Sequence, residues 1–127
     1  MAQLTKYGIA YDTSGTIYDS ARTSRTVNRT FKDVSAIGDT ELVAAQGAGN
    51  KIRVIGLMYN AGAAVTVRFK SSGANNLSAA FALALNDSIV FPYLPHGWFE
   101  TNANENFTAN QSLAIASGAQ IVWIVTT

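Results

Sequence analysis

From Phe31 to its end the chain is a series of short runs of alternating apolar and polar residues, each limited by turn residues. In Leu77–Leu85, apolar residues recur at every second position, and Ala64–Lys70 has the same period. This period is typical of strands that bury one face. The turn signals recur about every 8–12 residues, and no segment keeps a helical period over the length of a helix. The pattern predicts an all-β fold, an antiparallel β-sandwich of about eight strands that resembles a jelly roll.

Two strand pairings are predicted from the turns. Lys51–Tyr59 and Ala64–Lys70 flank an Asn-Ala-Gly-Ala turn, which favours a β-hairpin between them. Ser112–Ser117 and Gln120–Thr127 flank a Gly-Ala pair, which favours a final hairpin. The order of strands in the sheets does not follow from strand number alone.

The first thirty residues differ from the rest of the chain, because their polar clusters keep no lasting period. We interpret residues 1–30 as an extended N-terminal arm that is ordered where a partner receives it, and residues 31–127 as the sandwich domain. The cations at the end of the arm are candidates for a protein interface, where guanidinium groups pair with carboxylates. These residues are Arg22, Arg25, Arg29 and Lys32. Nucleic acid is the weaker alternative, because the basic residues lack interleaved aromatic side chains.

Charged residues make up only 13% of the chain, and the net charge is +1. The surface must therefore consist largely of uncharged polar and small side chains, as is common where much of it contacts other subunits. A net charge this small gives no overall field that would attract nucleic acid or a membrane. The chain has no cysteine, which excludes disulfides and thiolate chemistry. Its first ten residues lack the pattern of a signal peptide, so we expect synthesis in the cytoplasm.

Catalytic signals are weak. His96 is the single histidine, it lies in a Pro-His-Gly turn, and no Gly-x-Ser-x-Gly motif surrounds any serine. Glu100 and Glu105 flank a short loop and could be imagined as the carboxylate pair of a sugar hydrolase. Nothing else in the sequence supports that alternative, and one histidine with scattered acids does not supply a zinc site. We expect no enzymatic activity, no metal and no cofactor.

Aromatic residues gather around two prolines and a glycine near residue 95. The members of this aromatic corner, together with the histidine beside them, are Tyr93, His96, Trp98 and Phe99. A buried corner that closes one end of the sandwich is the favoured interpretation. The alternative is an exposed platform that stacks on sugar rings, which needs flat rings open to solvent.

From Glu41 onward, about two-thirds of the chain resembles a group of small bacteriophage structural proteins. The segments that carry the resemblance are Leu42–Ala45, Lys51–Leu57, Ala64–Lys70, Phe81–Leu85 and Phe91–Thr101. Each segment is low in complexity, and the resemblance depends on their order. It implies a β-sandwich protein of the virion with a capsid decoration, cement or head–tail accessory role, commonly trimeric. The partner would be the major capsid protein or another virion protein, and the N-terminal arm lies outside the match.

Other functions stay open. A carbohydrate- or receptor-binding module of a tail or fibre would use the exposed aromatic side chains, and a small sugar hydrolase would use Glu100 and Glu105. The major coat protein of a small virus has a compatible fold, although the arm is weakly basic for holding a genome.

Overall fold

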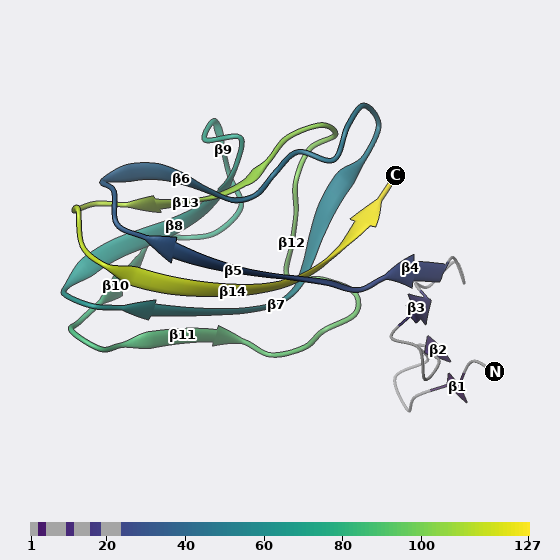
Figure 1. Ribbon diagram of the computed structural model, residues 1–127, viewed down its shortest axis with the longest axis horizontal. Helices are drawn as coiled ribbons and strands as arrows, with labels where there is room; N and C mark the ends of the chain where they lie inside the picture. The colour runs from purple at the N-terminus through teal and green to yellow at the C-terminus, as the bar shows by residue number, and fades with distance from the viewer. Residues whose placement is uncertain (1–2, 5–9, 12–15, 19–23) are drawn as a thin grey trace.

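The computed structural model describes residues 3–4, 10–11, 16–18 and 24–127. Within these residues all regular structure is β, and two antiparallel sheets pack face to face (Figure 1). None of the described residues forms a helix long and apolar enough to cross a membrane. The predicted all-β sandwich is confirmed.

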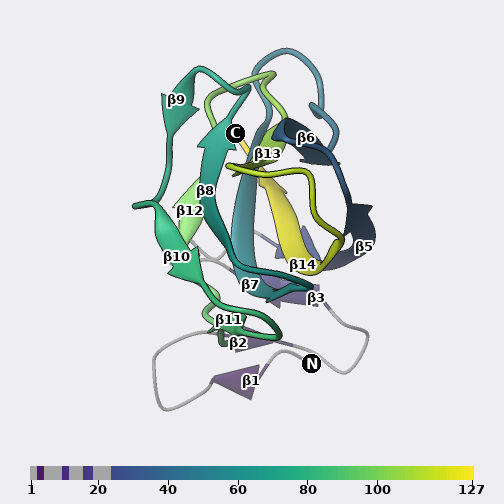
Figure 2. The ribbon, with the colours of Figure 1, turned by 90° about the vertical axis from the view of Figure 1, so that its left-hand side faces the viewer.

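The two sheets have five strands each. The β5 sheet has the order β11 (Ser88–Phe91), β7 (Lys51–Ala61), β14 (Ser117–Thr126) and β5 (Asn28–Val34), and the short β12 (Phe99–Glu100) also pairs with β7. The β6 sheet has the order β10 (Phe81–Leu83), β8 (Val65–Ser71), β13 (Phe107–Gln111) and β6 (Gly38–Val43), and β9 (Asn75–Asn76) pairs with β8. Figure 2 shows the two layers almost end-on.

Without the two short strands, eight strands remain, and their pairing is nested. The first strand of the eight pairs with the last (β5 with β14), the second with the seventh (β6 with β13), the third with the sixth (β7 with β11) and the fourth with the fifth (β8 with β10). The eight strands thus form four nested antiparallel pairs that are distributed over two sheets, which is the jelly-roll topology.

The predicted hairpin between residues 51–59 and 64–70 is wrong. β7 lies in one sheet and β8 in the other, so the intervening turn crosses the sandwich instead of joining neighbours. The same is true of the turn between β10 and β11. A short crossing between sheets about 10 Å apart needs the same glycine, asparagine and small residues as a hairpin turn, and sequence does not separate the two.

The predicted final hairpin is also wrong. Residues 117–126 form one continuous strand, β14, which pairs with β7 on one side and β5 on the other. Gly118 and Ala119 are therefore part of a central strand and not a turn.

The N-terminal segment differs from the predicted extended arm. Its described parts are short antiparallel strands in the order β1 (Gln3–Leu4), β2 (Ala10–Tyr11), β3 (Thr16–Tyr18) and β4 (Ser24–Thr26). These strands lie beyond the end of the sandwich at which β5 begins (Figure 1). β5 itself starts at Asn28, so the expected boundary between residues 30 and 31 falls inside a sandwich strand.

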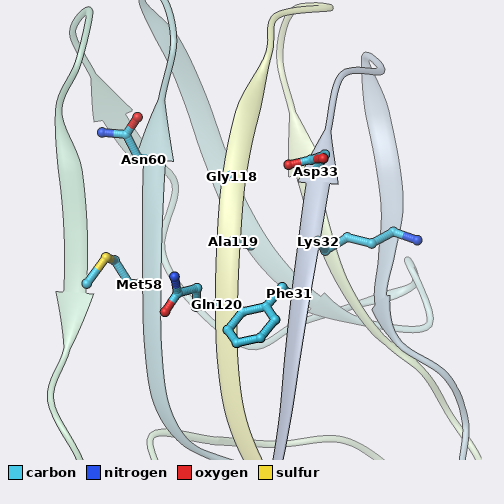
Figure 3. A pocket seen from close by; sticks show the side chains of 8 residues that line it. All are labelled: Phe31, Lys32, Asp33, Met58, Asn60, Gly118, Ala119 and Gln120. Atoms are coloured by element: carbon cyan, nitrogen blue, oxygen red, sulfur yellow. The ribbon is translucent and has the colours of Figure 1, made fainter.

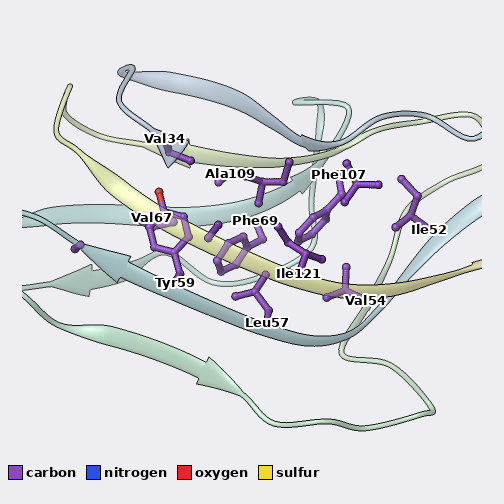
Figure 4. Close-up of a cluster of buried hydrophobic side chains, with 14 of the residues drawn as sticks. Val34, Ile52, Val54, Leu57, Tyr59, Val67, Phe69, Phe107, Ala109 and Ile121 are labelled. Carbon is purple, nitrogen blue, oxygen red and sulfur yellow. The ribbon is translucent and has the colours of Figure 1, made fainter. Parts of the chain in front are cut away.

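The interior is centred on Phe69, which is fully buried in β8. Its ring centroid lies 5.7 Å from those of Tyr59 and Phe99, and 5.8 Å from that of Phe107. Aliphatic side chains from both sheets surround these rings (Figure 4). Because the rings come from both layers, this cluster joins the sheets through apolar contact.

The buried side chain of Gln111 also joins the two sheets. Gln111 of β13 accepts hydrogen bonds from the Tyr59 and Ser117 hydroxyls of the β5 sheet, both at 2.7 Å. Its amide nitrogen donates to the carbonyl oxygens of Ala36 at 3.2 Å and Ile115 at 3.1 Å. Gln111 thereby fixes two loops and the spacing of the sheets, and burial raises the pKa of Tyr59 to about 12.

Candidate functional site

The outer face of the β5 sheet carries a row of exposed residues with little charge. Phe31, Gln120, Met58 and Val90 are cross-strand neighbours on β5, β14, β7 and β11. Directly opposite residues in a sheet point to the same face. Phe31 is 72% exposed, Val90 58% and Met58 45%. Single exposed apolar residues are ordinary, but a row across four strands is a candidate contact surface.

A shallow hollow of about 260 Å³ lies beside this row. It is lined by Phe31, Lys32, Asp33, Met58, Asn60, Gly118, Ala119 and Gln120. Figure 3 shows Met58 and Asn60 on one side of the hollow and Phe31 on the other, with Gln120 and the side-chain-free Gly118 of β14 between them. We call this surface, with Val90, the outer-face hollow.

Gly118 explains why the hollow exists. It is the second residue of the central strand β14 and lies opposite Asn60 of β7 and Asp33 of β5. A Cβ atom placed on it would meet no heavy atom within 4 Å. The missing side chain leaves the floor of the hollow as peptide backbone, which another protein can approach closely.

The charges of this sheet are arranged away from the centre of the hollow. Lys32 is directed away from it beyond β5, while Asp33 stands at the rim (Figure 3). At the other end of the sheet, Glu100 accepts a 2.9 Å hydrogen bond from Arg53 Nε and lies 3.8 Å from Lys51 Nζ. The hollow thus has apolar and uncharged polar side chains around its floor, with the charged Asp33 at its margin.

The outer face of the β6 sheet is different, because its polar side chains contact one another. Asn110 Nδ2 donates to Asp39 Oδ1 at 2.8 Å, and Asn106 Nδ2 donates to Glu41 Oε2 at 2.8 Å. Lys70 Nζ also lies 3.7 Å from Asp39 Oδ1. Acids on β6 and bases on β8 flank β13, so this face satisfies much of its own polar chemistry.

Three of the four predicted arm cations are among the described residues, and these three do not share one face. Arg22 lies outside the described residues. Arg25 is in β4, where its Nη1 donates to the carbonyl oxygen of Val125 at 3.3 Å. Arg29 and Lys32 are both exposed on β5, but three positions apart in a strand they face opposite sides.

The aromatic corner is split by the structure. Phe99 is half-buried, with its ring centroid 5.1 Å from that of Phe91, and it belongs to the core. Tyr93 and His96 are exposed, and Trp98 is 40% exposed. The Trp98 indole nitrogen donates to the Pro92 carbonyl oxygen at 2.7 Å, which fixes the indole against the turn.

The two candidate catalytic carboxylates have separate partners. Glu100 accepts from Arg53 and Thr126, whereas Glu105 accepts from Ser71 at 2.7 Å and from Asn102 at 3.1 Å. The hydrogen bond from Ser71 is the main reason that the pKa of Glu105 is lowered, opposite to the shift that a general acid needs. No group of three or more metal-ligating side chains occurs among the residues that the structure describes.

Sequence reasoning missed the residues that make the hollow. From the sequence, Phe31 is predicted to begin the sandwich domain and Gly118 to lie in a turn. Met58 lies in the predicted strand Lys51–Tyr59, and the sequence pattern predicts no surface role for Met58 or Val90. One sequence signal for this surface is available. The polar residues Gln120, Asn60 and Ser88 alternate with more buried residues along their strands, and they mark the face that is open to solvent.

No family model matches the chain, and no curated protein matches it. A solved structure of the disulfide-linked pili that form Bacillus endospore appendages is similar over 81% of this chain and 88% of that chain. The sequence identity is 14% and the TM-score is 0.43.

Proposed function

We propose that this chain is a non-enzymatic structural protein of a bacteriophage virion, of the capsid decoration or cement type. The single observation that carries the proposal is the outer-face hollow, a row of exposed, largely uncharged side chains beside the side-chain-free Gly118. Phe31 and Met58 are of the residue types enriched in the cores of protein interfaces. The bacteriophage assignment is supported by the resemblance of residues 41–127.

The jelly roll suits this role because it presents a stiff, flat surface. The two sheets are joined by the rings around Phe69 and by the hydrogen bonds of Gln111, so the outer face changes little on binding. A protein that binds only the assembled lattice of the major capsid protein stabilises it in proportion to its occupancy. The resemblance implies a threefold assembly, which is an alternative to the twofold pairing inferred below, and molar mass in solution separates the two.

The proposal places the main contact on the sheet face and not on the arm. Arg25 is engaged with the last strand of its own sandwich, and Arg29 is on the edge of the sheet. Attachment would depend mainly on shape and apolar burial.

Co-sedimentation with expanded heads of the encoding virus tests the proposal. We expect binding at about 0.1 M NaCl to persist at about 1 M, where the Debye length falls from about 10 Å to about 3 Å. Met58→Glu should weaken binding at least about tenfold, because it would bury a carboxylate with no partner. Asp39→Asn on the opposite face is the matched control. Release of the protein by moderate salt, or equal binding by Met58→Glu, would contradict the proposal.

A second candidate function rests on the exposed Trp98 and Tyr93. Exposed rings of this kind stack on sugars, so a tail- or fibre-associated carbohydrate-binding module would use this corner. A glycan-array signal that is lost in Trp98→Ala, with the melting temperature retained, would favour it over capsid decoration.

A further inference from the structure

β5 is an edge strand with an unusual side-chain pattern. Among the described residues it pairs with β14 on one side only. Its outer face presents Arg29, Phe31 and Asp33 in order, and all three are exposed. An open edge presents unpaired N–H and C=O groups, to which another strand can add.

The charges on β5 have no partner within the described part of the chain. Neither Arg29 nor Asp33 forms an ion pair there. They cannot pair with each other, because two residues four positions apart in a strand are separated by about 13 Å. The strand therefore holds a cation and an anion placed symmetrically about an exposed phenylalanine.

We propose that two copies of this protein associate through their β5 strands, antiparallel, with the two Phe31 residues opposite each other on a twofold axis. In this register Arg29 of each copy lies opposite Asp33 of the other, and Thr30 lies opposite Lys32. Opposite charges that face each other across neighbouring strands stabilise the pair, as does contact between aromatic rings. The occupant of the edge is thus a second copy of the same strand.

The charge pattern selects this register over its neighbours. A shift that moves the axis by one residue places Arg29 opposite a Phe31 or a residue outside Asn28–Val34, and both ion pairs are lost. Charges on an edge strand normally oppose association, but the register centred on Phe31 places opposite charges on the outer face together.

The pairing has a consequence for the outer-face hollow. Because directly opposite residues share a face, the twofold axis is perpendicular to the sheet, and both hollows lie on the same side of an extended sheet. Two equivalent contact surfaces could then engage one flat partner together, with avidity beyond a single contact. The inference goes beyond the proposed function, since the pair should form in the absence of any capsid.

Disulfide capture tests the register directly, because the natural chain has no cysteine. Directly opposite residues have Cα atoms about 4.5–5.5 Å apart, within the range that a disulfide spans. We expect Phe31→Cys to give a covalent dimer on oxidation. Lys32→Cys, whose copies are offset across the axis, and Val90→Cys, on the far edge strand, should stay uncrosslinked. Equal crosslinking of all three, or none at Phe31→Cys, would overturn the proposal.

Molar mass in solution tests the charge pairing. The wild-type chain should have twice the 13.5 kDa mass of one copy. Arg29→Asp and Asp33→Arg should each weaken association about tenfold, and the double variant, with the charges exchanged, should restore it. A monomer or a threefold mass for the wild type, or no restoration in the double variant, would refute the pairing. Capsid binding by a monomer would leave the proposed function intact.

Discussion

The two outer faces of the sandwich have the same backbone architecture but opposite surface chemistry. On the β6 sheet, Asp39, Lys70 and Asn110 bind one another across three strands. On the β5 sheet, Phe31 and Met58 stay exposed on either side of the uncharged Gln120. A face whose polar groups are already paired gains little from a partner, whereas a face with exposed apolar side chains gains by burying them.

This difference assigns separate roles to the two faces. Side chains on the β6 face should contribute to folding and little to binding. Side chains in the outer-face hollow should contribute to binding and little to folding. Both sheets contribute side chains to the interior, so a substitution there should have the largest effect on the free energy of unfolding.

The largest expected effect is that of Phe69→Ala. Removing a fully buried ring that contacts rings of both sheets should lower the free energy of unfolding by about 3–5 kcal/mol. Urea denaturation followed by tryptophan fluorescence measures the change. A loss below about 1 kcal/mol would show that the sheets are not held by this cluster.

Alkaline pH should have the next largest effect. Tyr59 has a folded-state pKa of about 12, above its ordinary value of 10.0, because burial disfavours the phenolate. Its contribution to stability is complete below pH 10 and is lost as pH rises toward 12, by on the order of 2 kcal/mol. Tyr59→Phe removes this titration. The same pH dependence in both proteins would contradict the assignment.

Asp39→Ala should have a smaller effect, confined to folding. It removes a hydrogen bond from Asn110 and a partly exposed ion pair with Lys70, together worth roughly 0.5–1.5 kcal/mol. Binding to capsids should not change. If binding falls while stability is kept, the roles of the two faces are reversed.

Phe31→Ser should have the smallest effect on folding. Because the side chain is 72% exposed, the free energy of unfolding of the isolated chain should change by no more than about 0.5 kcal/mol. Thermal unfolding at low protein concentration provides the measurement. A loss comparable to that of Phe69→Ala would mean that Phe31 is part of the core.

The strands themselves were predictable, because the alternation of apolar and polar residues shows which face of each strand is buried. β8 follows the expected pattern over its whole length, with Val65, Val67 and Phe69 inside. The strand pairs were not predictable from the turns. In a jelly roll, neighbours in sequence often lie in different sheets, so local turn chemistry carries no information about which strand pairs with which.

The candidate site was less predictable than the fold. Cations and aromatic side chains attracted attention because their chemistry is distinctive, yet Arg25 binds backbone and Phe99 belongs to the core. The hollow depends on residues from three strands and on a glycine without a side chain. Such a surface becomes visible only when the register of β5, β14 and β7 is known.

The most direct test of the central claim is Gly118→Leu, measured for both capsid binding and stability. The new Cβ would meet no atom within 4 Å, and the rest of the side chain would extend into the hollow. We expect the melting temperature to be unchanged or higher, because glycine weakens a strand by about 0.5–1 kcal/mol, while binding falls at least about tenfold. Binding equal to that of the wild-type protein would contradict the claim that this face is the contact surface.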